Sequence, residues 1–324
     1  MILLHLPRIF KRGESFFAFS TNVLDIAVDF CCVLYEIISK GEGGLTMPRG
    51  LALAIGLNSV DPKHYGGWSG ELNACEADAE DMADIARSRN FNVKSLLTKA
   101  ATRAKVTAEI SKAASTLKAG DIFMLSYSGH GGQLPDLNRD EPDAQDETWC
   151  LYNGELVDDE LYALFGKFKR GVRILVFSDS CHSGTVVKLA YYQGTTTTRG
   201  SWVSSQSVRY RFMPPDVALR TYRKNRKFYD PILKKAKLKE TRIAVKASVL
   251  LISGCQDNQL SADGDFNGLF TAQLLRVWKN GSFKGDYREF HASIVRRMPP
   301  DQTPNYFRAG QTDSKFEAQR PFTI

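Results

Sequence analysis

The sequence lacks the cysteine spacings of a disulfide framework or a zinc site, and it lacks long uncharged runs. Its six cysteines are scattered over 324 residues without a Cys-x-x-Cys pair, which argues against both kinds of site. No stretch of 18 residues is free of charged side chains, so we expect no membrane span and no membrane partner. The N-terminal residues do not follow the basic, apolar and small-residue order of a secretion signal. These absences favour a cytoplasmic protein.

The composition is that of a globular protein. Hydrophobic residues make up 43% of the chain, enough for a sizeable core, and the length permits one large α/β domain or two ordinary ones. The pattern of a folded domain begins only at Met47. We therefore hypothesise that residues 1–46 are an N-terminal extension outside the native chain, and that residues 47–324 form one domain.

Positive charge is concentrated in one part of the chain. The formal net charge is +7, yet residues 199–246 alone hold 14 Lys and Arg against three Asp and Glu. Pro214, Pro215 and Pro231, together with sparse apolar periodicity, predict a long exposed insertion at about 190–246. We call this insertion the basic segment.

From residue 51 onward, apolar runs alternate with amphipathic stretches, and this alternation predicts a mostly parallel sheet with helices on both faces. Asn73 followed by Glu76 resembles a capping box and predicts the start of a helix there. The fold class we expect is therefore α/β. The predicted strands are 51–58, 91–97, 121–127, 172–178 and 247–254, and helices are predicted after Asn73 and over 158–168 and 268–280.

A histidine and a cysteine each follow a predicted buried strand. His130 lies in SGHGG at 128–132, and Cys181 lies in SDSCHSG at 178–184. The carboxyl ends of neighbouring parallel strands, about 4.8 Å apart, meet at one edge of a sheet, so these side chains can come together. A thiol is mostly protonated at neutral pH, and a nearby imidazole can activate it as a nucleophile. The pair therefore predicts covalent catalysis by a cysteine.

Main-chain donors beside these residues complete the predicted chemistry. The flanking glycines let the N–H groups of Gly131 and Cys181 approach a developing oxyanion. A lone cysteine at a strand end is usually a core residue, and a lone histidine in a glycine turn is usually a hydrogen-bonded loop residue. The two residues at separate strand ends favour catalysis over these structural alternatives.

Several motifs stand in order between residues 48 and 285, namely RGLALAIGLN, NACEADAEDM, YSGHGGQ, SDSCHSG and SGCQDNQLSADGDFNGLFT. Together they resemble the caspase-like cysteine peptidases, in particular the metacaspases and the prokaryotic metacaspase-like orthocaspases. The resemblance implies a caspase-like three-layer sandwich, a thiol endopeptidase with a His130 and Cys181 dyad, and no organic cofactor.

By the same resemblance, Asp78, Ser128 and Asp179 line the pocket for the residue before the cut. Buried carboxylates are costly unless a cation pairs with them, so protein or peptide substrates with Arg or Lys at that position are the expected partners. The structural alternative for Asp78 is an acid placed favourably in the first turn of its helix. For Asp179 it is a cap of the turn that follows.

The resemblance also raises the question of a calcium ion. Asp146, Asp158 and Asp159 match three positions of a metacaspase calcium site, whereas the fourth falls at Lys188, a cation where the ion needs an oxygen ligand. Asp158 and Asp159 also have a structural explanation as the cap and first turn of a helix over 160–168. No metal is required by these observations, and calcium dependence stays open.

The basic segment has three interpretations. It is a linker that the peptidase cuts in itself, or an electrostatic patch for nucleic acid or an acidic partner, or a solvated loop without a role. An intact dyad favours the peptidase and its self-processing over a catalytically silent regulator or scaffold, and nucleic acid is the less favoured partner. The arginines that stand in exposed-looking sequence are Arg209, Arg211, Arg220, Arg223 and Arg226.

Overall fold

The structure is a computed structural model. It describes residues 47–135, 145–180, 210–235, 245–255, 263–264 and 266–324. The chain divides into two units, Met1–Met47 and Pro48–Ile324, and the fold described below is that of the second unit.

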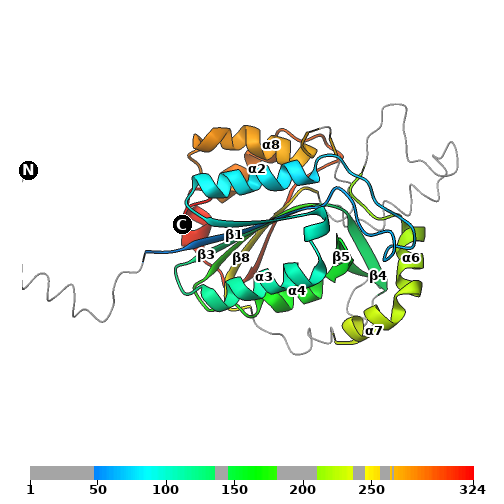
Figure 1. Ribbon diagram of the computed structural model, residues 1–324. Coiled ribbons are helices and arrows are strands. Elements are labelled where there is room, and N and C mark those ends of the chain that lie inside the picture. The colour runs from blue at the N-terminus through cyan, green and yellow to red at the C-terminus, as the bar shows by residue number, and fades with distance from the viewer. Residues whose placement is uncertain (1–46, 136–144, 181–209, 236–244, 256–262, 265) are drawn as a thin grey trace, which may run out of the picture. The chain divides into compact units, whose positions relative to one another are not determined.

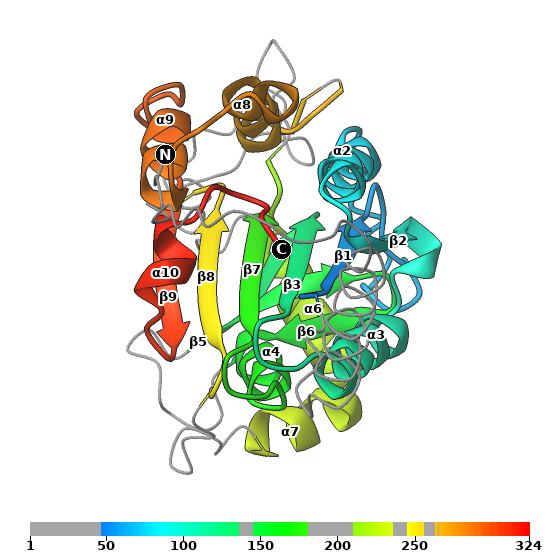
Figure 2. The ribbon, with the colours of Figure 1, turned by 90° about the vertical axis from the view of Figure 1, so that its left-hand side faces the viewer.

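A six-stranded sheet forms the centre of this unit, with the strand order β2-β1-β3-β7-β8-β9 (Figure 2). Neighbouring strands from β2 to β8 run parallel, and β9 pairs antiparallel with β8. The predicted α/β class with a mostly parallel sheet is confirmed. The strands are β1 (Gly50–Gly56), β2 (Asn92–Leu97), β3 (Ile122–Ser128), β7 (Arg173–Asp179), β8 (Ser248–Ser253) and β9 (Asn305–Gly310).

Helices cover both faces of the sheet (Figure 1). Strand β3 is buried along its whole length because alternate side chains face different layers. Phe123 and Leu125 belong to one core, and Ile122 and Met124 belong to the other. The helices of one face are α2 (Cys75–Ser88) and α8 (Leu269–Trp278), those of the other are α3 (Arg103–Thr116) and α4 (Asp158–Phe165), and α9 (Tyr287–Val295) and α10 (Ser314–Ala318) follow near the C-terminus.

A second, antiparallel sheet lies beside the carboxyl end of β3. It consists of β4 (Gly131–Pro135), β5 (Gln145–Leu151) and β6 (Gly154–Val157). The ring of Trp149 in β5 stacks on Tyr127 in β3 with 4.4 Å between centroids, and its indole N–H donates to the hydroxyl of Ser178 at 3.2 Å. The small sheet is therefore fixed to the ends of the central strands.

The described part of the basic segment is folded against the domain, so the prediction of an exposed insertion is wrong for residues 210–235. Two helices form here, α6 (Pro215–Lys224) and α7 (Arg226–Lys235), next to β4 in Figure 1. Val217 packs in a cluster with Tyr65, and Tyr229 packs with Leu134. Both short helices are amphipathic. A few apolar residues at helical spacing are enough to bury one face of each helix, and the basic residues lie on the other face.

The capping box predicted at Asn73 and Glu76 is also wrong. The N-cap of α2 is Ala74, and its side chain makes no capping hydrogen bond. Asn58 supplies the missing acceptor, because its Oδ1 accepts from the N–H of Glu76 at 3.1 Å. The carboxylate of Glu76 accepts instead from the hydroxyl of Thr98. Caps from distant parts of the chain replace the local one here.

Among the described residues, no helix is long and apolar enough to cross a membrane.

Candidate active site

The carboxyl ends of three neighbouring strands bring the predicted site residues to one edge of the sheet. In the parallel register, Gly56 of β1 pairs with Ser128 of β3, and Ser128 pairs with Asp179 of β7. Helix α2 begins beside the same edge and carries Asp78 in its first turn. This is the edge at which open α/β sheets build their binding sites.

Asp78, Ser128 and Asp179, predicted as pocket residues, lie together and enclose the guanidinium of Arg211. The Ser128 hydroxyl donates to Asp78 Oδ2 at 2.8 Å. Arg211 Nη2 lies 2.7 Å from Asp78 Oδ2, and Arg211 Nη1 lies 2.9 Å from Asp179 Oδ2. We call Asp78, Ser128, Asp179 and Asp263, described next, the acid pocket.

Asp263 is a fourth member of the acid pocket that sequence reasoning missed. Its Oδ1 lies 2.9 Å from Arg211 Nη2, and only 1% of its side chain is exposed. The motif SADGDFNG contains Asp263 and contributed to the resemblance, but no local pattern ties it to Asp78, which lies far away in the sequence. The signal available was an acid in a glycine-rich loop after a predicted strand, which is where sites of this fold class lie.

Arg211 fills the acid pocket, although the sequence suggested that it is exposed. It has no exposed surface, and the space left beside Asp78, Ser128 and Asp179 is about 10 Å³, roughly the room of one water molecule. A Cβ atom on Gly268 would stand only 2.5 Å from the guanidinium nitrogens. The pocket wall at residue 268 therefore has room only for glycine while the arginine is bound.

Charge in the acid pocket explains why the arginine is held there. Burial raises the pKa of Asp78, and the neighbouring guanidinium opposes that rise. Burial alone would lower the pKa of Arg211, but the surrounding carboxylates, Asp179 first among them, raise it well above its ordinary value. Three carboxylates share one cation, so an arginine side chain is strongly favoured in this pocket.

His130 lies at the same edge, in the turn between β3 and β4. The turn is fixed because the Tyr127 hydroxyl and the N–H of Cys150 both donate to the His130 carbonyl, at 2.7 and 2.9 Å. The ring packs against Trp68 with 4.7 Å between centroids. His130 Nε2 lies 3.0 Å from the carbonyl oxygen of Gly70, which can only accept, so Nε2 carries the proton.

The imidazole of His130 is neutral at physiological pH. Burial lowers its pKa to about 4, against smaller raising effects of the Gly70 carbonyl and Asp263. The backbone of Phe212, the residue after Arg211, also acts on this ring and slightly raises its pKa. With the proton on Nε2, the Nδ1 atom carries the lone pair. This is the protonation state in which an imidazole accepts a proton from a nucleophile.

The backbone around Arg211 pairs with Gly131, the predicted oxyanion donor. The N–H of Gly131 donates to the carbonyl oxygen of Arg211 at 3.0 Å, and the N–H of Met213 donates to the carbonyl of Gly131 at 2.7 Å. Phe212 thus forms a parallel bridge with Gly131. The residue whose side chain fills the acid pocket therefore also presents its carbonyl to this N–H group.

Two predicted residues lie outside the described part of the chain. These are Cys181, the expected nucleophile, and Lys188, the position that argues against calcium. Ser180 is the last described residue before Cys181, and it is fully buried at the end of β7.

The acids predicted for calcium stand on two different elements. Asp146 is buried in β5, and Asp158 and Asp159 begin α4. Within the described residues, no three His, Cys, Asp or Glu side chains are grouped so that they could hold a metal ion. Both Asp158 and Asp159 lie in the first turn of α4, as the helical explanation expected, but the N-cap is Val157, so the prediction of a capping aspartate is wrong.

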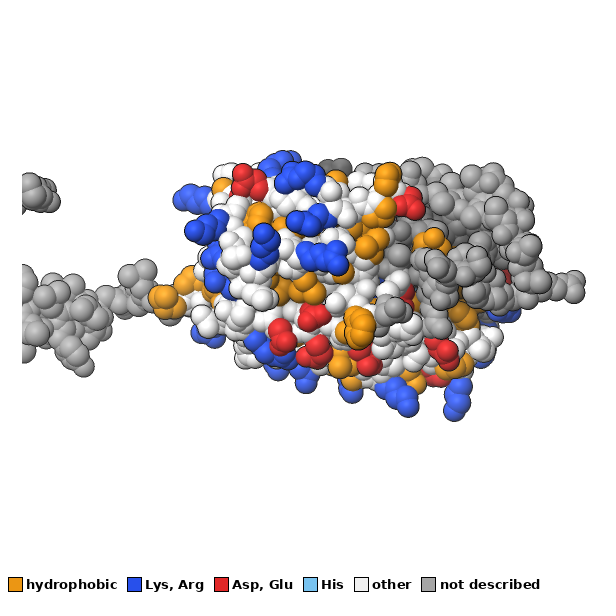
Figure 3. Space-filling model, turned by 90° about the horizontal axis from the view of Figure 1, so that it is seen from above, with side chains coloured by type: hydrophobic (Ala, Val, Ile, Leu, Met, Phe, Trp, Pro, Cys, Tyr) orange, Lys and Arg blue, Asp and Glu red, His pale blue; other side chains and the backbone are white. Residues whose placement is uncertain are grey.

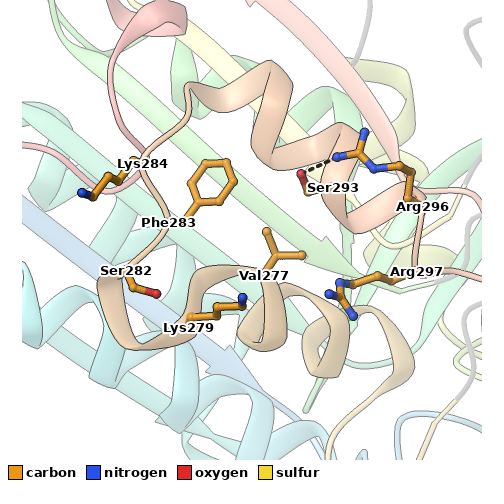
Figure 4. A pocket seen from close by; sticks show the side chains of 8 residues that line it. All are labelled: Val277, Lys279, Ser282, Phe283, Lys284, Ser293, Arg296 and Arg297. Atoms are coloured by element: carbon orange, nitrogen blue, oxygen red, sulfur yellow. Dashed lines mark hydrogen bonds between the residues drawn. The ribbon is translucent and has the colours of Figure 1, made fainter.

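A separate groove of about 700 Å³ runs along α8 and α9 (Figure 4). Lys and Arg side chains gather over this face of the molecule (Figure 3), and none of the described residues that line the groove is acidic. None of its residues belongs to the acid pocket. The lining residues are Val277, Lys279, Ser282, Phe283, Lys284, Ser293, Arg296 and Arg297.

Sequence comparisons relate the chain to metacaspases of fungi. It is 28% identical over 249 residues to Metacaspase-1 of Mycosarcoma maydis, which covers 68% of this chain and 59% of the relative. Metacaspase-1 of Kluyveromyces lactis is 28% identical over 298 residues, covering 83% of this chain and 66% of the relative. The chain thus spans about three fifths to two thirds of the length of these two relatives.

Structural comparisons give the same fold. The crystal structure of protein GSU0716 from Geobacter sulfurreducens is 68% identical, covers 86% of this chain and 99% of that chain, and superposes with a TM-score of 0.77. Caspase-1 from Spodoptera frugiperda is 11% identical, covers 81% of this chain and 86% of that chain, and gives a TM-score of 0.50. The second match shows the fold alone.

A model of the caspase domain matches residues 49–316, which is most of the chain and includes every element of the acid pocket. The matched range contains the six-stranded sheet and the edge at which the site residues meet. This chain therefore belongs to the caspase-domain family of peptidases, with distant relatives among the metacaspases.

Proposed function

We propose that the protein is a cysteine endopeptidase that cleaves after arginine or lysine. The observation that carries the proposal is the position of Arg211. Its side chain fills the acid pocket through Asp78, Asp179 and Asp263, and its carbonyl oxygen accepts from the N–H of Gly131. This pairing of both the side chain and the carbonyl supports Arg211 as a residue before a scissile bond.

The proposed reaction passes through an acyl-enzyme. The sulfur of Cys181 attacks the carbonyl carbon while His130 takes the thiol proton, and the N–H groups of Gly131 and Cys181 stabilise the oxyanion. The leaving amine takes the proton from His130, and a thioester remains. Water, deprotonated by the same imidazole, then releases the carboxylic acid. The neutral state of His130 supports its part in the first step.

We also propose that the chain cuts itself between Arg211 and Phe212. Peptidases bind extended chain, and residues 211–213 are extended beside Gly131. The other described arginines of the basic segment lie in α6 and α7, where Arg220 and Arg226 pair with Asp216 and Asp230 one helical turn away. Arg209 lies outside the described residues. Arg211 is therefore the described arginine best placed for cleavage.

Turnover of three matched fluorogenic peptides tests the proposal. Peptides ending in Arg, Lys or Asp before the reporter are incubated with the full chain and with its Cys181→Ala variant. We expect turnover of the Arg and Lys peptides, none of the Asp peptide, and none with the variant. Turnover of the Asp peptide, or equal rates with the variant, would contradict the proposal.

A catalytically silent caspase-fold regulator is the second candidate, and the complete burial of Arg211 favours it. A pocket that holds its own arginine permanently would accept no substrate. The basic outer faces of α6 and α7, with Arg223, Lys224 and Lys227 exposed, would then serve a partner. In that case the wild-type chain stays intact and none of the three peptides is cleaved.

A further inference from the structure

We propose that Asp263 makes the acid pocket selective for arginine over lysine. The inference rests on the proposed peptidase function and narrows it to one substrate residue. Asp263 contributes the third carboxylate of the pocket, from the loop that follows β8.

The acid pocket matches the two terminal nitrogens of a guanidinium. Nη1 of Arg211 donates to Ser128 Oγ at 2.8 Å and lies 2.9 Å from Asp179 Oδ2. Nη2 donates to Asp78 Oδ2 at 2.7 Å and to Asp263 Oδ1 at 2.9 Å. The Nε atom has no hydrogen-bond partner among the described residues. Nη1 also donates to the backbone carbonyl of Asp179 at 3.4 Å, so the pocket contacts the guanidinium through its two terminal nitrogens.

A lysine cannot occupy this arrangement fully. Its ammonium is a single nitrogen on a side chain one bond shorter, with three N–H donors, whereas the planar guanidinium places two nitrogens side by side. If the ammonium lies between Ser128 and Asp179, the buried carboxylate of Asp263 is left without a cation. That uncompensated charge disfavours lysine.

The orientation of Asp263 is fixed from its other side. Its Oδ2 accepts from the N–H of Asn73 at 2.8 Å, and its Oδ1 from the N–H of Ala74 at 3.4 Å. These groups precede α2, whose N-cap has no side-chain acceptor of its own, and such N–H groups stabilise an anion. Asp263 thus aims one oxygen at Nη2 and anchors the other.

The substitution Asp263→Asn separates the charge from the shape of the pocket. The amide of asparagine keeps one oxygen for the N–H of Asn73, and its NH₂ group then faces Nη2 of the arginine, donor against donor. The substitution therefore weakens the binding of an arginine more than the binding of a lysine, because the lysine ammonium does not depend on Asp263. A purely structural role would weaken both residues alike.

A double-mutant cycle on self-cleavage in the full-length chain measures this selectivity. The first-order rate of cleavage after residue 211 is compared in the wild type, Arg211→Lys, Asp263→Asn and the double variant. With Asp263 present, we expect lysine to slow the cut about ten- to a hundredfold, the range of one charge-assisted hydrogen bond. In Asp263→Asn, we expect the arginine rate to fall and the difference between arginine and lysine to shrink to a few fold.

Asp84→Asn is the matched control, because Asp84 is an exposed acid of α2 that pairs only with Arg87 on the surface. In the Asp84→Asn variant, we expect the ratio of the self-cleavage rates with arginine and with lysine at residue 211 to equal the wild-type ratio. If Asp263→Asn does not fold by circular dichroism, Asp263→Glu, which keeps the charge but displaces it, is expected to reduce the ratio instead.

The outcomes separate the two proposals. An arginine to lysine ratio that is the same with and without Asp263, or close to one in the wild type, overturns the role of Asp263 and leaves the peptidase intact. Failure of the wild type both to cut itself and to cleave an arginine peptide overturns the proposed function itself.

Discussion

Arg211 donates from Nη2 to Asp78 at 2.7 Å, and both side chains are almost completely buried. The two residues lie 133 positions apart in the sequence, in a predicted linker and at a helix start. Their contact joins the basic segment to the edge of the sheet where the predicted site residues meet.

Removal of the Arg211 side chain should destabilise the folded protein. Arg211→Ala leaves three buried carboxylates without their cation, so we expect the free energy of unfolding to fall by about 3–5 kcal/mol. Thermal unfolding measures this loss. Benzamidine, a guanidinium-like cation, should raise the melting temperature of this variant and leave the uncut Cys181→Ala chain unchanged. An equal effect of benzamidine on both chains would show that Arg211 does not block the pocket.

A methyl group at residue 268 should exclude the arginine. A Cβ there would lie 2.5 Å from the guanidinium, while the backbone of Gly268, with φ of −59°, suits any residue. We expect Gly268→Ala to fold with reduced stability, because the buried carboxylates lose part of their pairing with Arg211. Cleavage after Arg211 should slow at least tenfold, because a displacement of about 1 Å at a reacting site can cost a hundredfold in rate. Gel analysis of self-cleavage with time provides the measurement. A normal rate in the folded variant would mean that this wall does not contact the reacting arginine.

Glu155 should make the stability of the domain depend on pH. Burial raises its pKa to about 7 from the ordinary 4.5 of a glutamate, and Oε2 accepts from the Thr148 hydroxyl at 2.7 Å. The folded state binds this proton more tightly than the unfolded state. Its contribution is therefore fully present below about pH 4.5 and is lost as the pH rises through about 7.

The variant Glu155→Gln tests this dependence in the Cys181→Ala background. We expect it to be more stable than its parent at pH 8, by an amount on the order of 3 kcal/mol, with a smaller difference at pH 5. Melting temperatures at the two pH values give the comparison, and Glu80→Gln on the exposed surface of α2 serves as the control. A difference that does not grow with pH would contradict the assignment.

Calcium removal should leave the activity intact. No three acidic, His or Cys side chains of the described chain are grouped to hold an ion, and the remaining predicted position, Lys188, carries the wrong charge. We expect the same rate of arginine-peptide turnover in EGTA as in added calcium. A strong loss in EGTA that calcium restores would reject this expectation.

The predictable part of the fold was the part with strong local patterns. The apolar runs that end at Ser128 and Asp179 predicted two adjacent parallel strands, and the structure pairs these two residues directly. Asp78 lies beside them, 2.8 Å from the Ser128 hydroxyl, and its role in a substrate pocket stays a prediction. The roles assigned to His130 and Cys181 stay predictions.

The parts that the sequence did not reveal depend on long-range contacts. Helices α6 and α7 are rich in charge, and only their packing against Tyr65 and Leu134 shows which face is buried. Asp263 meets Arg211 through the fold alone. The missed cap of α2 has the same cause, because Asn58 and Asp263 supply from a distance what Asn73 was expected to supply locally.

Fragment mapping of the purified full-length chain tests the central claim most directly. Mass spectrometry and N-terminal sequencing are applied to wild type and to Cys181→Ala after the same incubation. We expect a wild-type fragment that begins at Phe212 and is absent from the variant. An intact wild-type chain, or a cut after Arg211 that persists in the variant, would contradict that claim.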